Sequence, residues 1–311
     1  MCPGNAVCMA NGQCVTPYDG GGDADCPDII VDVAPVVPTV VLLIDQSGSM
    51  TENFGGVSRW NAVRTALTDD TNGVVMQLES QVIFGASLYT GTNNSCPRMT
   101  SVTPAINNGD EIKELLDDNN PLDNTPTAEA VAAAAAAFPA SDGPRILVLA
   151  TDGDPDTCED PNSNGQAGPR TGSENAVAAA YAAGITTFVL SVGQDTEATH
   201  LLNLSRVGQG QDKLTGTATP YIANSPAALA QAFNDIIGDV RTCDFKLDGS
   251  VSSSDADQGV VSLDGTPLTY GTDWELNNGD EFKLLGESCN TYLTNEDADL
   301  SATFPCGLVV Q

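Results

Sequence analysis

The sequence predicts an α/β fold in which a doubly wound, mostly parallel sheet is covered by helices, followed by a small β domain. The first observation is a regular alternation of strand and helix patterns between Cys26 and Cys243. The second is that residues 39–45 and 145–151 are almost continuously apolar, as in parallel strands buried on both faces. The third is a change after Cys243 to short strand patterns separated by turn residues. We therefore expect a Cys-rich segment and linker (1–25), an α/β domain (26–242) and a small disulfide-stapled β domain (243–311).

The amino-terminal segment is too short to bury a core. It contains Cys2, Cys8 and Cys14 at six-residue spacing, followed by a glycine-rich spacer at residues 20–22. Three cysteines are an odd number, so either a partner was lost upstream or one thiol is free.

The α/β domain shows strand and helix patterns in alternation. Strands are expected near 39–45, 81–89, 145–151, 185–192 and 219–223. Helices are expected near 58–68, 109–117, 125–138, 173–183, 197–207 and 225–241. Ala132 to Ala137 is a strong helix-forming run whose small side chains permit close packing on the sheet. Residues 29–33 are expected to add an edge strand.

The β domain is indicated by short strands and turns. A hairpin around Asp264-Gly265 is expected at 260–268, with further strands at 282–285 and 300–304. Cys289 and Cys306 flank the loop between the last two strands and are the expected pair. Trp274 is expected in the core rather than in a binding site.

Polar side chains follow the first buried strand at alternate positions. Asp45, Ser47 and Ser49 come at its carboxyl end, where the chain turns through Gly48. Their side chains can converge from a tight loop at the edge where open α/β sheets bind ligands.

Two segments farther along the chain complete a known pattern. Thr125 begins a Thr-x-Thr loop that leads into a helix, and Asp152 follows the strand at 145–151 in an Asp-Gly loop. With the Asp-x-Ser-x-Ser run, these segments resemble the von Willebrand factor A domain, which carries a metal-ion-dependent adhesion site. The resemblance implies that one divalent cation is held by Asp45, Ser47, Ser49, Thr125 and Asp152.

The oxygen ligands of this set suit Mg²⁺, Mn²⁺ or Ca²⁺, whereas zinc and copper prefer imidazole and thiolate. The chain has a single His. The resemblance further implies one open coordination position for water or for an acidic group of a partner. Two alternatives remain at this stage: the metal only stabilises the loops, or hydrogen bonds hold the loops without any metal.

The acidic loop from Asp152 to Asp160 either holds a second calcium ion or shapes the rim of the site, or it is a solvated loop with Asp152 as its only ligand. We favour the solvated loop. Within it, Asp154 is expected to accept a hydrogen bond from metal-bound water. Gln46, at the variable motif position, is expected to shape the loop through its backbone.

The resemblance also suggests disulfide pairs. The two ends of an A domain lie close together, which implies a Cys26–Cys243 bond. Cys96 and Cys158 are expected in loops near the metal-bearing face and are predicted to pair. The amino-terminal segment resembles the short Cys-rich repeats that precede A domains in secreted proteins of myxobacteria and related bacteria.

Charge and cysteine content restrict location and partners. With 42 acidic and 11 basic residues, the net charge of −31 repels nucleic acid and anionic membranes, so neither is expected as a partner. Nine cysteines predict an oxidising compartment. No apolar run reaches the roughly 18 residues that cross a bilayer. We expect a secreted or cell-surface protein without direct membrane insertion, compatible with an upstream lipid anchor.

An enzyme is not expected, because acid/base and nucleophilic groups are scarce. His200, on a predicted helix, is the only histidine, and Ser47 lacks the glycine pattern of a hydrolase elbow. Two functions remain: a cation-dependent adhesion module for a protein or acidic glycan, and a structural subunit that packs on neighbouring subunits of a bacterial surface filament or coat. Cation-dependent ligand binding would support the first, and metal-insensitive self-association the second.

Overall fold

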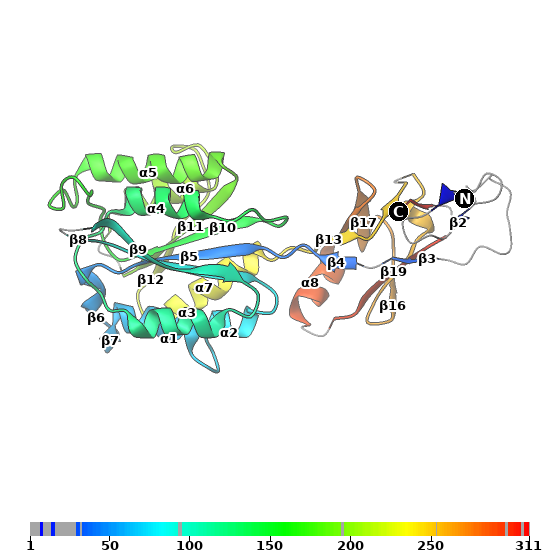
Figure 1. Cartoon of the computed structure of the whole chain (residues 1–311), viewed down its shortest axis with the longest axis horizontal. Helices are drawn as coiled ribbons and strands as arrows, with labels where there is room; N and C mark the ends of the chain where they lie inside the picture. Colours follow the sequence, from blue (N-terminus) through cyan, green and yellow to red (C-terminus); the bar gives the residue numbers. More distant parts are fainter. Residues whose placement is uncertain are drawn as a thin grey trace. The chain divides into compact units, whose positions relative to one another are not determined.

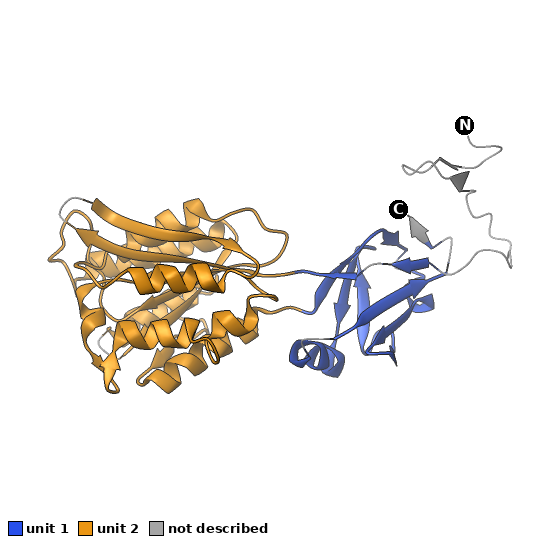
Figure 2. Cartoon of the chain, turned by 60° about the horizontal axis from the view of Figure 1, so that its bottom comes forward, with its two compact units in different colours: residues 1–36, 243–311 blue, residues 37–242 orange. Residues whose placement is uncertain are grey.

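A computed structural model describes residues 29–310 except 32, 93–94, 194–195, 253, 296–297 and 306–307, together with the paired strands β1 (Val7–Cys8) and β2 (Cys14–Val15). The chain forms two compact units (Figure 2). The α/β unit is Val37–Thr242, and the β unit combines Met1–Val36 with Cys243–Gln311. Among the residues described, no helix is long and apolar enough to cross a membrane.

The α/β unit has a six-stranded sheet that is parallel except for one edge strand. The strand order is β12-β11-β10-β5-β8-β9, and β9 runs antiparallel to β8 (Figure 1). The bounds are β5 Thr39–Asp45, β8 Ile83–Thr92, β9 Ser95–Ala105, β10 Arg145–Thr151, β11 Ile185–Val192 and β12 Tyr221–Ala223. This confirms the predicted doubly wound, mostly parallel architecture.

Helices cover both faces of this sheet (Figure 1). One face packs against α1 Arg59–Thr68, α2 Val74–Leu78, α3 Gly109–Asp118 and α7 Pro226–Val240, and the other against α4 Thr127–Ala137, α5 Ala167–Ala182 and α6 Ala198–Gly208. All seven residues of β5 are buried. Leu42 contributes to the core on one face and Leu43 to the core on the other. This explains why the strand sequence is apolar at nearly every position.

The edge strand β9 was not expected from the sequence. It contains Pro97 and Pro104, and proline cannot donate a hydrogen bond to a sheet. At the edge of a sheet those missing donors are tolerated. Two further small elements were not predicted either, the helix α2 and the ribbon of β6 (Asn53–Phe54) with β7 (Val57–Ser58).

Among the described residues, the β unit contains two four-stranded sheets, two short strand pairs and one α-helix. The sheets have the orders β17-β18-β13-β4 and β16-β15-β19-β3, and β14 pairs with β20. The bounds are β3 Ile29–Val31, β4 Val33–Pro35, β13 Asp244–Leu247, β14 Ser250–Val251, β15 Val260–Leu263, β16 Thr266–Leu268, β17 Trp274–Asn277, β18 Glu281–Leu284, α8 Gly286–Thr294, β19 Leu300–Phe304 and β20 Val309–Val310. The hairpin around Asp264-Gly265 is present as β15 and β16. Trp274 is fully buried in the core of this unit, as predicted.

The expected domain start at Cys26 and the expected edge strand at 29–33 are corrected by the pairing of β3 and β4. β3 pairs with β19 and β4 pairs with β13, so both belong to the β unit. Val31 packs in the same core as Trp274. The apolar side chains just before the α/β unit therefore complete the other unit's core, and the α/β unit begins at Val37.

Two disulfides lie among the described residues. Cys96 bonds Cys158 across a sequence separation of 62, as predicted. Cys243 bonds Cys289, which corrects the predicted pairs Cys26–Cys243 and Cys289–Cys306. The unpredicted helix α8 carries Cys289 to the start of β13, and Cys243 is buried there. Cys26 and Cys306 lie outside the described residues.

Candidate metal-binding site

The carboxyl end of β5 presents Asp45 at the edge of the sheet. Asp45 is fully buried. Its Oδ1 accepts a hydrogen bond from the Ser47 amide at 2.8 Å, and its Oδ2 accepts one from the Thr151 hydroxyl at 2.7 Å. Thr151 ends the neighbouring parallel strand β10. The carboxylate is therefore held between the ends of two adjacent strands.

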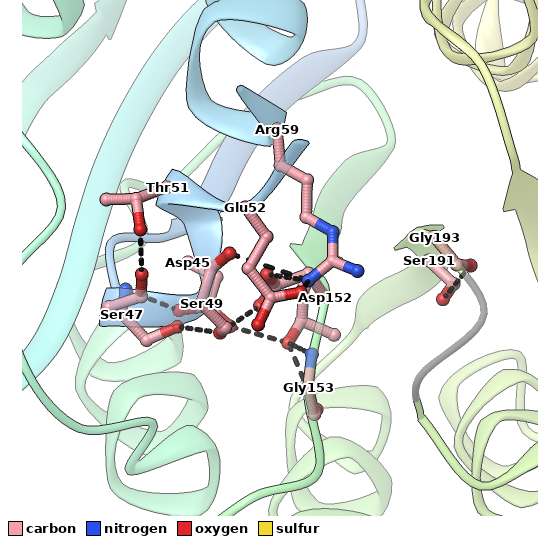
Figure 3. A network of polar contacts seen from close by, with 12 residues as sticks. Asp45, Ser47, Ser49, Thr51, Glu52, Arg59, Asp152, Gly153, Ser191 and Gly193 are labelled. Atoms are coloured by element: carbon pink, nitrogen blue, oxygen red, sulfur yellow. Dashed lines mark hydrogen bonds and ion pairs between the residues drawn. The ribbon is translucent and has the colours of Figure 1, made fainter. Parts of the chain in front are cut away.

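A chain of hydroxyls connects the turn after β5 with Asp152 (Figure 3). The turn is a short 3₁₀ helix, η1, over Gly48–Thr51. The hydroxyls of Ser47 and Ser49 lie 3.0 Å apart and share a hydrogen bond, and Ser49 Oγ donates to Asp152 Oδ1 at 2.7 Å. Asp152 is fully buried. The structure thus brings together Asp45, Ser47, Ser49 and Asp152, four of the five residues predicted to hold a cation.

The fifth predicted residue, Thr125, lies in a loop that contacts both other segments. The amide of Gly48 donates to the Asp123 carbonyl at 3.1 Å, and a Cβ at Gly48 would lie 3.2 Å from the Leu122 carbonyl oxygen. Glycine is thus the residue that permits this close approach. On the other side, the Thr125 amide donates to Asp156 Oδ2 at 2.8 Å, and the Asp156 amide donates to the Thr125 carbonyl at 3.0 Å.

Gln46 and Asp154, the two residues predicted at the rim of the site, are held by different contacts. Gln46 contacts two neighbouring segments: its backbone amide donates to the Tyr89 carbonyl, and its side chain donates to the Asn120 carbonyl at 2.6 Å. Asp154 was predicted to accept a hydrogen bond from metal-bound water. Both of its oxygens accept hydrogen bonds from Arg170, at 3.1 Å from Nε and 2.6 Å from Nη2, and its role toward metal-bound water stays a prediction. This ion pair anchors the loop to α5.

The sequence reasoning missed three side chains of the site: Thr151, Asp156 and Arg59. Thr151 directly precedes the recognised Asp152, and Asp156 lies in the acidic loop that follows it, so their positions in the sequence were the available signal. Arg59 is the first residue of α1 and is only 6% exposed. Its Nη1 donates to Asp152 Oδ2 at 2.9 Å and lies 3.0 Å from Glu52 Oε2. No sequence pattern marked this arginine as a buried partner of the motif.

Burial dominates the electrostatics of the site. It raises the pKa of the Asp45 carboxyl to about 7, and the charge of Asp152 adds to this shift against the hydrogen bonds from Thr151 and Ser47. Burial also raises the pKa of Asp152, opposed by the hydrogen bonds from Ser49 and Arg59. For Asp156, burial raises the pKa to about 6. Ionised carboxylates in such a place need a positive charge nearby.

The donor set fits a hard divalent cation. Asp45 and Asp152 supply carboxylate oxygens, and Ser47 and Ser49 supply hydroxyl oxygens on the same small surface. Across the described ranges, no group of three or more His, Cys, Asp or Glu side chains could hold a metal, so hydroxyls would have to complete the coordination. Carboxylate and hydroxyl oxygens are ligands of Mg²⁺, Mn²⁺ and Ca²⁺.

The disulfide Cys96–Cys158 ties the loop after β10 to the edge strand β9. Near it, the Cys158 amide donates to Glu129 Oε1 of α4 at 2.9 Å. An antiparallel bridge between Gly91 and Asn124 joins the Thr125 loop to β8. The segments that carry Thr125 and Asp152 are thus fastened to the same edge of the sheet.

Comparisons with known proteins give one family match. Residues 39–232 match the model of the von Willebrand factor type A domain. No curated protein matches the chain.

Solved structures show the same fold at low sequence identity. The pilus adhesin SpaC from Lactobacillus rhamnosus GG is similar in one crystal form with a TM-score of 0.50 and 15% identity, covering 93% of this chain and 44% of that chain. Its open conformation gives a TM-score of 0.51 and 14% identity, covering 93% and 43%. The minor pilin PilB from Streptococcus sanguinis gives 0.49 and 14%, covering 67% and 62%. The chain spans less than half the length of the SpaC chain it matches.

Proposed function

The chain belongs to the von Willebrand factor type A domain family, and from this membership we propose that it binds an acidic ligand through a divalent cation held at the end of β5. The observation that carries the proposal is the hydrogen-bonded set of Asp45, Ser47, Ser49 and Asp152, formed where β5 and β10 end side by side. Open α/β sheets bind their ligands at this edge.

The proposed ligands of the cation are Asp45, Ser47, Ser49, Thr125 and Asp152. When bound, Mg²⁺, Mn²⁺ or Ca²⁺ would supply a positively charged centre that attracts a carboxylate or another acidic oxygen of the partner. Asp45 is oriented by the Ser47 amide and the Thr151 hydroxyl, and the backbone of Thr125 is held by hydrogen bonds with the side chain and the amide of Asp156. These contacts hold the Asp45 carboxylate and the Thr125 backbone before any cation arrives and so reduce the entropy lost on binding.

The partner is proposed to be a protein or an acidic glycan outside the cell. The net charge of −31 repels acidic molecules at long range, so a bound cation would have to provide the local attraction. Disulfides in both units are consistent with a secreted or cell-surface location. The proposed role is binding rather than catalysis: His200 is buried and contacts Glu174 of α5.

A direct test is calorimetric titration of Mg²⁺, Mn²⁺ and Ca²⁺ into metal-stripped protein at about 0.15 M salt, where nonspecific attraction is screened. We expect one saturable site in the wild type that is lost in Asp45→Ala. Glu159→Gln is the matched control, because it removes one exposed negative charge from the loop that follows Asp152. Equal weak binding by all three proteins would contradict the proposal.

Ligand recognition is tested separately, with acidic peptides and acidic glycans presented on a surface. Retention of the wild-type protein in Mn²⁺, its release by EDTA and the failure of Asp45→Ala to be retained are the expected results. Retention that EDTA leaves unchanged would argue against recognition through the cation.

One observation favours the alternative of a structural subunit. β3 is the edge strand of its sheet as far as the structure describes it, and Ile30 on this strand is 77% exposed. Exposed edge strands can pair with another chain. Self-association that is unaffected by EDTA and lost in Ile30→Lys would support this function, measured by analytical ultracentrifugation.

A further inference from the structure

The guanidinium of Arg59 is held beside Asp152 by several contacts. Nη1 donates to Asp152 Oδ2 at 2.9 Å, lies 3.0 Å from Glu52 Oε2 and approaches the Ser49 carbonyl oxygen at 3.5 Å (Figure 3). The backbone amide of Arg59 donates to the Glu52 carbonyl at 3.0 Å. The side chain thus contacts the turn that carries Ser49 and the carboxylate of the neighbouring strand end.

Gly193, after β11, also contacts the Arg59 guanidinium. A Cβ there would lie 3.1 Å from Nη2, 3.3 Å from Nε and 3.5 Å from Cζ of Arg59. The backbone of Gly193 has a φ of +112°, which L residues with side chains rarely adopt. The guanidinium therefore lies against bare backbone, where a side chain at position 193 would crowd it.

The position of this arginine has an electrostatic meaning. Only 11 of the 311 residues are Lys or Arg, and this one is 6% exposed, with its charge against a fully buried carboxylate. Burying a cation is unfavourable unless an anion compensates it, and the same holds for Asp152. The pair satisfies both groups when no metal is bound. It also places a positive charge beside the oxygens proposed to bind a second positive charge.

We propose that Arg59 is a resident counter-ion of the site, which neutralises Asp152 in the metal-free protein and opposes binding of the divalent cation. The inference rests on the proposed function, because it concerns the affinity of that site. Arg59 occupies Oδ2 of Asp152 and leaves Oδ1, bonded to the Ser49 hydroxyl, on the hydroxyl side. The site therefore has a lower cation affinity than its two carboxylates alone would give.

The test compares Mn²⁺ titrations of metal-stripped wild type, Arg59→Gln and Arg59→Lys, together with thermal unfolding of each protein in EDTA. Arg64→Gln is the matched control, because it removes the same charge from the same helix at an exposed pair with Asp117. We expect Arg59→Gln to bind Mn²⁺ at least tenfold more tightly, since like charges no longer repel in a site of low effective dielectric constant. Arg59→Lys and Arg64→Gln should remain within about threefold of the wild type.

Unfolding in EDTA gives a readout that does not depend on metal. Arg59→Gln should unfold at a lower temperature than the wild type, because Asp152 loses its partner. When Arg59→Gln is introduced into the Asp152→Asn variant, it should lower the unfolding temperature in EDTA much less than it does in the wild type. Higher Mn²⁺ affinity of Arg59→Gln together with a lower unfolding temperature in EDTA would support the role of Arg59 as a counter-ion.

The other outcomes separate this inference from the proposed function. If the wild type binds Mn²⁺ and Arg59→Gln binds equally or more weakly, Arg59 only positions Asp152 and the inference is overturned, while the proposed function stands. If Arg59→Gln binds and the wild type does not, the inference is supported and the proposed function fails. If neither binds, both fail.

Discussion

At the scale of single residues, the site contains two buried carboxyl groups whose burial is unfavourable to the folded state. Asp45 and Asp152 are both fully buried, and burial raises the pKa of each. A carboxylate with a raised pKa in the folded state destabilises the protein at neutral pH. Hydrogen bonds from Ser47 and from the Thr151 hydroxyl offset part of this cost at Asp45. Under the proposed function, a bound cation would offset this loss of stability.

Asp45→Asn should therefore separate stability from cation binding. In EDTA at pH 7 we expect its free energy of unfolding to rise by about 1 kcal/mol or more, since one pKa unit corresponds to about 1.4 kcal/mol. Added Mn²⁺ should stabilise the wild type and leave the variant unchanged. Urea unfolding with and without Mn²⁺ measures both effects. Glu159→Gln serves again as the exposed control, and an Asp45→Asn variant less stable than the wild type in EDTA would contradict this account.

At the scale of elements, the Cys96–Cys158 disulfide holds the loop after β10 against β9. Closing a loop of this length contributes about 4 kcal/mol in the chain-entropy model. We expect the double variant Cys96→Ser/Cys158→Ser to lower the unfolding temperature of the α/β unit and to weaken Mn²⁺ binding several-fold, because Asp152 and Asp156 lie on the released loop.

The control for that variant lies in the other unit. Cys243→Ser/Cys289→Ser removes a disulfide that belongs to the β unit and should leave Mn²⁺ affinity unchanged. Calorimetric unfolding and Mn²⁺ titration of both double variants check the prediction. Equal Mn²⁺ affinity in the two would show that the loop after β10 keeps its shape without the bond.

A buried contact between α5 and α6 should make stability depend on pH. Burial lowers the pKa of His200 against the opposing effect of Glu174. Burial alone would raise the pKa of Glu174, but hydrogen bonds from Lys213, Asn203 and His200 together lower it. A lowered histidine pKa means that the unfolded chain takes up a proton first, so stability is present above about pH 6.5 and declines as the pH falls.

Lowered pKa values of His200 and Glu174 both act in this direction, with Glu174 contributing at lower pH, below about 4.3. Asp45 and Asp156, whose pKa values burial raises to about 7 and about 6, act in the opposite direction over this range, so the effect of His200 is measured as a difference between two proteins. Between pH 7 and pH 5 we expect the unfolding temperature of the wild type to decline relative to that of His200→Gln, although the variant starts lower at pH 7. Calorimetry at pH 7, 6 and 5 measures the two slopes. Parallel slopes would assign the pH dependence to other groups.

The elements that could be predicted from the sequence are those whose apolar residues are all buried in the core of a single unit. Continuous apolar residues marked β5 and β10, and the polar residues after them marked the site. The strand β9 could not be predicted, since Pro97 and Pro104 favour loops wherever an edge position is not known in advance. Residues 29–33 were predicted as an edge strand of the α/β domain, but β3 and β4 pair with strands of the β unit. The sequence of such a short apolar segment does not indicate which core it joins.

The site was predictable to the extent that its residues follow strands directly. Asp45 and Asp152 end or follow buried strands, and Ser47 and Ser49 share a turn with Asp45. Arg59 was not predictable, because its burial depends on a bare backbone at Gly193, which is distant in sequence. The ion pair of Asp154 with Arg170 was not predictable, because Arg170 belongs to a helix that begins earlier than its sequence pattern indicated.

At the scale of the whole molecule, self-repulsion accompanies a net charge of −31. Salt screens such repulsion, so raising NaCl from about 0.02 M to about 0.5 M should raise the unfolding temperature by several degrees. MgCl₂ at the same ionic strength should add a further increase in the wild type only, and none in Asp45→Ala. Calorimetry in matched buffers checks this. An equal response of both proteins to Mg²⁺ would indicate general screening alone.

The division of the chain into units has a mechanical consequence. Residues 29–35 and 243–310 belong to the β unit, so the polypeptide leaves that unit once, forms the α/β unit and returns. Tension between the two ends of the chain would pass through the strand pairs of the β unit. Ile29 faces Phe304 in the pairing of β3 with β19, so such tension would unzip this pair from one end. The α/β unit lies outside that path, and its proposed cation site would keep its shape under load until the β unit opened.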